Sequence, residues 1–153
     1  MPNTYTQINI HTVFAVKGRE NILHKALMEE SCKYIHGIMI NLRQYPLAIS
    51  GYENHVHLFF EQNPDTPLSD IMEKVKANSS KWMNHNNKVP GHFEWQRGYG
   101  GFSYSRSQRN EVIQYIMNQE KHHQRNSFKD EYLAILKNYE IEYDDRYLFE
   151  FYD

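Results

Sequence analysis

The chain is organised around Glu53-Asn54-His55-Val56-His57-Leu58-Phe59-Phe60, in which two histidines flank one bulky apolar residue. In a β-strand, residues two positions apart point to the same face of the sheet. This spacing predicts that His55 and His57 lie side by side while Val56 points into a core. Imidazole is the commonest side-chain ligand for metal ions. The pair is therefore either part of a metal site or two exposed histidines on an ordinary strand.

A second pair, far along the chain, favours the metal site. Tyr115 and Gln119 are four residues apart in a stretch with helical spacing, so both are predicted on one helix face. An amide oxygen beside two imidazoles leaves positions open for water and substrate, and this mixed set of ligands suits Mg or Mn. A phenol beside such a cation can attack a phosphodiester. The two pairs together predict metal-assisted phosphodiester chemistry with Tyr115 as nucleophile.

Two further histidines leave the third ligand open. His122 and His123 follow Gln119 by three and four positions, on about the same helix face. Either could replace Gln119 or contact a phosphate, but Gln119 is preferred because it lies about one helical turn from Tyr115. His11, on the first predicted strand, is expected in the core or behind the ligands.

The rest of the chain is predicted to alternate between strands and helices. Apolar spacing and turn residues place a strand at 6–16, a helix at 22–43, a strand pair at 45–52 and 55–62, a helix at 68–84, strand-like pieces at 92–97 and 101–105, and helices at 108–124 and 129–138. This order predicts an α+β fold: a ferredoxin-like or RRM-like antiparallel sheet with helices on one face, plus a C-terminal helix carrying the tyrosine. A single domain over 1–153 is expected, with an acidic tail at about 139–153.

Charge is unevenly distributed along the 153 residues, whose formal net charge is −2. Residues 72–129 hold ten Lys or Arg against four Asp or Glu, and residues 130–153 hold two against eight. The basic middle predicts a polyanion-binding face and the acidic end a solubilising or docking tail, with two ordinary solvated faces as the alternative. The nucleic-acid contacts expected are Lys74, Lys76, Lys81, Arg97, Arg106, Arg109, Lys121, His123 and Arg125.

Other features of the sequence narrow the classes of protein. Cys32 is the only cysteine, which excludes a disulfide within the chain and a cysteine zinc cluster and fits a reducing cytoplasm. No apolar run is long enough to span a bilayer, and residues 1–5 do not resemble the start of a secretory signal. A nucleotide-binding glycine loop is also missing. That agrees with a covalent intermediate, which conserves the energy of the broken bond and needs no ATP.

His55-Val56-His57 followed by Tyr115-x-x-x-Gln119 resembles the HUH endonucleases, where U stands for a bulky hydrophobic residue. Within them the chain resembles the single-tyrosine transposases of the smallest bacterial insertion sequences. The resemblance covers most of the chain and includes segments 11–14, 95–99 and 115–123. One departure is Asn54, where relatives commonly have an acidic residue.

The resemblance implies an enzyme that cleaves and rejoins single-stranded DNA at insertion-sequence ends through a covalent 5′-phosphotyrosine. His55, His57 and Gln119 would bind Mg or Mn, and Tyr115 would be the nucleophile. The implied partners are DNA hairpins near the element ends and a second copy of the chain, with the tyrosine helix of one subunit often completing the site of the other. A non-catalytic RRM-like module that binds single strands, and a replication-initiator or relaxase relative, remain as alternatives.

Overall fold

The structure, a computed structural model, describes residues 3–18 and 22–152. Its elements are β1 (Asn9–Ala15), α1 (Lys25–Asn41), β2 (Tyr45–Tyr52), β3 (His55–Glu61), α2 (Leu68–His85), β4 (Gly100–Tyr104), η1 (Arg106–Gln108), α3 (Arg109–Met117), α4 (Gln119–His123), α5 (Phe128–Asn138) and η2 (Asp145–Tyr147). The strands form one antiparallel sheet in the order β2-β3-β1-β4. The expected α+β fold with a ferredoxin-like sheet is confirmed.

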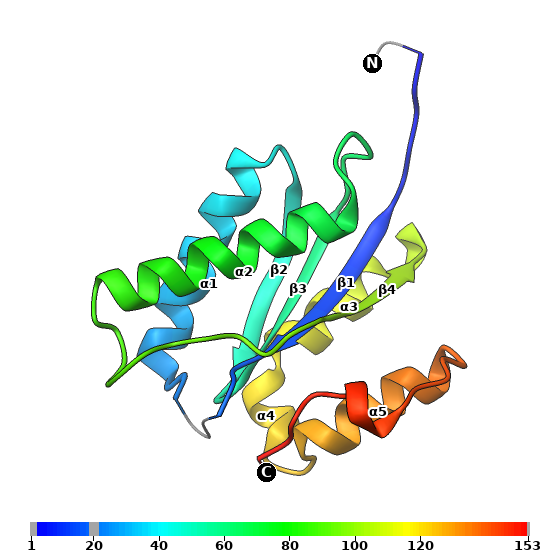
Figure 1. Cartoon of the computed structure of the whole chain (residues 1–153). Coiled ribbons are helices and arrows are strands. Elements are labelled where there is room, and N and C mark those ends of the chain that lie inside the picture. Colours follow the sequence, from blue (N-terminus) through cyan, green and yellow to red (C-terminus); the bar gives the residue numbers. More distant parts are fainter. Residues whose placement is uncertain (1–2, 19–21, 153) are drawn as a thin grey trace.

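Helices cover both faces of this sheet, so the predicted placement of the helices on one face is wrong (Figure 1). α1 and α2 pack on one face, where Val56 and Phe60 of β3 join the main core. α3 packs Ile116 against Phe59 of β3 on the opposite face, and α5 packs there against β1 and β4. The tyrosine helix therefore lies across the sheet from α1 and α2, and two more helices follow it.

Strand alternation places the histidines as predicted. β1 and β3 are the central strands, and side chains on both of their faces are buried because helices cover both. Val56 joins the core under α1 and α2, while His55 and His57 share the opposite face with Phe59. His57 lies opposite Val13 of β1 in the strand register.

Two predicted elements differ in the structure. The helix expected over 108–124 is broken at Asn118, whose backbone has φ −100° and ψ 24° and whose N–H donates to the carbonyls of Gln114 and Tyr115. The strand-like piece expected at 92–97 makes, among the described residues, a single bridge between Val16 and Trp95. No strand forms there because the Asn84 side chain takes both backbone groups of the neighbouring Phe93, at 2.7 and 2.9 Å.

The last residues fold back against α5 and the loop before β4. The Gln96 side chain binds Glu150 in both directions: its amide donates to the Glu150 carbonyl at 2.8 Å and its oxygen accepts from the Glu150 N–H at 2.7 Å. Phe149 and Phe151 contact Phe128 at the start of α5, with ring centroids 5.9 and 5.3 Å apart. This end of the chain therefore supports α5. Within 3–18 and 22–152, no helix is both long and apolar enough to cross a membrane.

Candidate metal and tyrosine site

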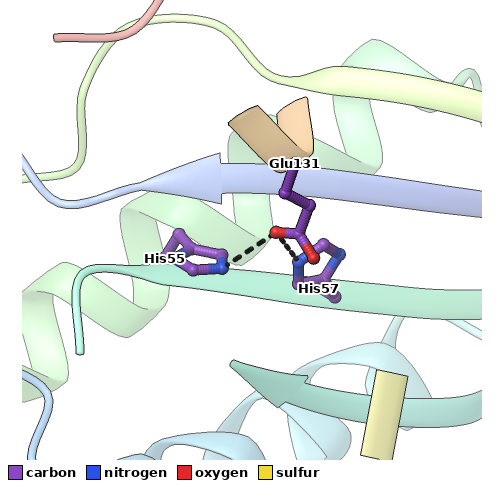
Figure 2. A group of neighbouring side chains, drawn as sticks. All are labelled: His55, His57 and Glu131. Atoms are coloured by element: carbon purple, nitrogen blue, oxygen red, sulfur yellow. Dashed lines mark hydrogen bonds and ion pairs between the residues drawn. The ribbon is translucent and has the colours of Figure 1, made fainter. Parts of the chain in front are cut away.

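Glu131 of α5 is the centre of the site, and the sequence analysis missed it. Its Oε1 atom lies 3.3 Å from His55 Nε2 and 3.1 Å from His57 Nε2 (Figure 2). All three side chains are buried, with at most 2% of each exposed. The three ligand atoms lie within 4.8 Å of one another, which is close enough to hold one metal ion.

The start of α5 explains how this carboxylate reaches the sheet. Ser127 caps the helix by accepting from the Asp130 N–H at 3.1 Å. Phe128 in the first turn stacks flat on the His55 ring, with centroids 3.9 Å apart and planes within 5°. Residues three apart share a helix face, so Glu131 faces the sheet beside Phe128. This apolar–acidic spacing after a helix cap was the signal available in the sequence.

The predicted tyrosine and glutamine lie at the other oxygen of the same carboxylate. The Tyr115 hydroxyl donates to Glu131 Oε2, and Gln119 Nε2 donates to that atom at 3.1 Å. Gln119 Oε1 lies 3.2 Å from His55 Nε2. The structure thus brings the proposed nucleophile and the proposed ligands together within one chain, although the helix between Tyr115 and Gln119 is broken.

Three more imidazoles surround this centre. His11 is buried behind His57, with its Nε2 2.7 Å from His57 Nδ1 and the two rings stacked. The His123 Nε2 lies 3.2 Å from Glu131 Oε1, so His123 belongs to the site rather than to the basic surface. The His122 Nε2 lies 3.3 Å from Glu131 Oε2, and its side chain is 28% exposed.

Burial sets the charge of these groups. It lowers the pKa of His55 to about 4 and the pKa of His11 well below its ordinary value, so both rings are neutral at pH 7. Burial alone would raise the pKa of Glu131, but the electrostatic interaction with His57 and hydrogen bonds with the neighbouring imidazoles outweigh it and hold that pKa far below its usual range. The centre is therefore a buried anion among nitrogen ligands.

The Tyr115 phenol keeps its proton in this arrangement. Burial raises its pKa, and the adjacent Glu131 carboxylate raises it further. A protonated phenol is a poor nucleophile. The site as described holds the tyrosine in place without activating it.

The basic residues predicted to contact nucleic acid are dispersed. Lys74 and Lys81 are exposed on α2, across the sheet from the site, so the structure does not bring them to Tyr115. Lys76 instead donates to the carbonyls of Gln96 and Gly98, both at 2.7 Å, and so holds that loop.

The remaining basic residues differ in how free they are. Arg109 pairs with Glu61 and donates to Asn9 Oδ1 at 2.9 Å, so its guanidinium is engaged. Four of them are exposed. Arg106 lies just before α3, Lys121 in α4, Arg125 just after α4, and Arg97 in the loop before β4. The first three are therefore close in sequence to the elements that carry Tyr115 and Gln119.

A hollow of about 650 Å³ lies next to the site, between α1, β2 and α4. Tyr52 lines it and also stacks on the His123 ring, with centroids 5.3 Å apart. Lys25 and Lys33 line it together with acidic residues such as Glu120, so its charge favours no particular ligand.

Comparisons with known proteins add three findings. A family described as "Transposase IS200 like" matches residues 4–119. A solved structure described as a candidate transposase from Deinococcus radiodurans R1 is similar with a TM-score of 0.61 and 22% identity, covering 76% of this chain and 94% of that one. A REP-associated tyrosine transposase bound to a REP hairpin is similar with a TM-score of 0.58 and 13% identity, covering 79% of this chain and 72% of that one. No curated protein matches the chain.

Proposed function

Because this chain belongs to the IS200-like transposase family, we propose that it cleaves and rejoins single-stranded DNA at insertion-sequence ends through a covalent 5′-phosphotyrosine on Tyr115. The protein is a transposase, and the proposal concerns its substrate, its intermediate and its metal dependence. One observation carries the proposal: the Tyr115 phenol and the His55–His57 pair meet at the same carboxylate, Glu131.

The covalent step is a transesterification. The Tyr115 oxygen attacks the scissile phosphorus, so an oxygen–phosphorus bond forms to the protein while the bond to the 3′-oxygen breaks. The phenol proton ends on the released 3′-hydroxyl, and the reverse reaction joins a new 3′-hydroxyl to the phosphate. Glu131 positions the phenol through its hydrogen bond until the DNA arrives. A positioned nucleophile lowers the entropy cost of the reaction.

The ligand set fits a divalent cation. The site brings together two imidazoles, from His55 and His57, and the Glu131 carboxylate. The amide oxygen of Gln119 lies beside the His55 Nε2 atom. A divalent ion bound there would polarise the phosphate and stabilise the charge that develops during displacement. His55, His57 and Glu131 are the proposed ligands, with Gln119 beside them.

DNA hairpins, a homodimer and a cytoplasmic location complete the proposal. The hairpin-bound relative supports a hairpin substrate. The edge strand β2 has an unpaired side that a second copy could use. A chain with Cys32 as its only cysteine is compatible with a reducing compartment.

The burial of aromatic residues on the sheet argues against the alternative of an RRM-like binding module. Such modules bind bases on aromatic side chains of an open sheet face. Here Phe59 and Phe102 of the sheet are 0% and 3% exposed, because α3 and α5 lie over them. The family match also favours a transposase over a replication initiator or relaxase.

Labelled single-stranded DNA from the flanks of the gene tests the proposal. We expect the protein to form an adduct on a denaturing gel that requires Mg or Mn, and Tyr115→Phe to abolish it because the attacking oxygen is removed. Hairpin binding should remain. Tyr34→Phe, at a partly exposed tyrosine on α1, is the matched control and should form the adduct normally. An adduct that persists in Tyr115→Phe would show that another residue is the nucleophile.

A further inference from the structure

Three imidazoles, not two, face the same carboxylate oxygen. The Nε2 atoms of His55, His57 and His123 lie 3.3, 3.1 and 3.2 Å from Glu131 Oε1. The His123 side chain is 2% exposed, as deeply buried as the pair on β3. The third ring comes from α4, far along the chain from the other two.

In each of these three rings the other nitrogen, Nδ1, has a polar partner on the side facing away from Glu131. The His123 Nδ1 lies 2.8 Å from the carbonyl of Asn126, which can only accept, so this nitrogen carries the hydrogen. The His55 Nδ1 lies 3.0 Å from Asn54 Oδ1, and the His57 Nδ1 lies 2.7 Å from His11 Nε2. Such outer hydrogen bonds fix the tautomer of metal-binding histidines.

With Nδ1 directed at the Asn126 carbonyl, the His123 Nε2 atom points into the site. That Nε2 then faces two acceptors, Glu131 Oε1 at 3.2 Å and Gln119 Oε1 at 3.0 Å. Gln119 is oriented this way because its amide nitrogen donates to Glu131 Oε2 at 3.1 Å. Nitrogen and oxygen atoms that converge at these distances in a buried space form the kind of ligand set that a cation site requires.

We propose that His123 is a third imidazole ligand of the cation, and that the resulting set of His55, His57, His123 and Glu131 selects a transition-metal ion over Mg²⁺. This inference rests on the metal dependence in the proposed function and names the class of metal. Imidazole nitrogen suits ions such as Co²⁺ and Zn²⁺, whereas Mg²⁺ prefers oxygen ligands and keeps much of its water. His122 is not included, because it lies at the other carboxylate oxygen.

Calorimetric titration of the full chain with CoCl₂, MnCl₂ and MgCl₂ tests this inference. We expect Co²⁺ to bind at least about tenfold more tightly than Mg²⁺. His123→Ala should weaken Co²⁺ binding by at least about tenfold and Mg²⁺ binding much less, because Co²⁺ binds imidazole nitrogen well and Mg²⁺ prefers oxygen. His36→Ala, which removes an exposed imidazole on α1, is the matched control and should change neither. Equal losses for both ions would show that His123 only supports the fold.

A second measurement needs no variant. On addition of ZnCl₂ to the ¹⁵N-labelled protein, three imidazole Nε2 resonances should shift together, including that of His123. A shift confined to His55 and His57 would overturn the inference and leave the proposed function standing. If the wild-type protein binds none of these ions, the metal dependence of the proposed function fails as well.

Discussion

Glu131 is the residue that joins the two halves of the chemistry. Its Oε1 faces the imidazoles, and its Oε2 accepts from the Tyr115 phenol. Because the carboxylate is buried, each of these contacts acts with little screening by water. A single side chain therefore links the state of the cation site to the position of the nucleophile.

His11 supports this centre from behind. For His57 to offer Nε2 to a cation, its Nδ1 must donate to His11 Nε2, 2.7 Å away. His11→Leu removes that acceptor, so metal affinity should fall about 10–100-fold. The unfolding free energy of the metal-free protein should change by less than about 1.5 kcal/mol, because the volumes are similar and a buried polar ring is lost. Calorimetry and urea unfolding measure the two effects.

His11→Gln is the matched control, since its side chain can still accept a hydrogen bond near the same place. It should recover much of the affinity. If His11→Leu instead unfolds easily and binds metal normally, His11 is only a packing residue.

The site residues that could be predicted were those with local spacing. His55 and His57 follow from strand alternation, and Tyr115 and Gln119 from helical spacing, and the structure brings all four together. The role of Glu131 was not predicted, because this residue lies on a separate helix in an acidic region where no single carboxylate stands out. Nothing in the local pattern says that α5 folds over β3, since this depends on the packing of Phe128 and of the chain end.

At the scale of elements, the hairpin of β2 and β3 determines where the first histidine lies. Gly51 faces Val56 in the strand register, close to the turn. A Cβ atom at Gly51 would lie 2.1 Å from the His55 carbonyl oxygen and 3.0 Å from Val56 Cα. These are backbone atoms that cannot rotate away, so the close approach requires glycine.

Gly51→Ala should therefore destabilise the protein by about 3 kcal/mol, at the upper end of the usual cost of overpacking. It should also weaken metal binding, because the His55 backbone must move. Gly37→Ala in α1 is the matched control: nothing lies within 4 Å of its Cβ position. That change should stabilise the protein by about 0.5–1 kcal/mol, since alanine favours a helix. Urea unfolding of both variants measures the two changes in unfolding free energy. If Gly51→Ala does not destabilise the protein relative to Gly37→Ala, the hairpin backbone can shift to accommodate the added Cβ atom.

Apolar spacing predicted the order and kind of the main helices and strands. It did not predict the interruption of a helix at Asn118 or the absence of a strand at 92–97. Asn118 interrupts a helix whose apolar spacing appears continuous in the sequence. The 92–97 piece has the composition of a strand, but Asn84 on α2 takes the backbone groups of Phe93. The second outcome depends on a side-chain contact between separate elements, which the local apolar pattern does not contain.

At the scale of the whole molecule, the candidate site residues lie together within the single chain that the structure describes. Gln119 and Glu131 contact His55 and His57 of the same polypeptide, and Tyr115 donates to Glu131. The resemblance described in the sequence analysis implies instead that the tyrosine helix of one subunit completes the site of another. This chain therefore offers a direct test of whether the tyrosine works on its own histidines.

A mixture of two inactive variants provides that test. Tyr115→Phe lacks the nucleophile and His57→Ala lacks a ligand, so neither alone should form the DNA adduct. If each chain uses its own tyrosine, mixing the two should give no adduct, because no chain holds a complete site. Recovery of adduct upon co-refolding would show that subunits exchange their tyrosine helices. Wild-type protein mixed with either variant serves as the positive control.

The family match ends at residue 119, whereas His123 and Glu131 lie beyond it. A gene copy cut short by a frameshift at, for example, codon 125 would keep both strand histidines and the tyrosine. A genome survey that searches only for the histidine pair and the tyrosine would count such a truncated copy as intact, although it lacks Glu131. If Glu131 is a ligand as proposed, scoring the acidic residue on α5 as well would separate working copies from decayed ones.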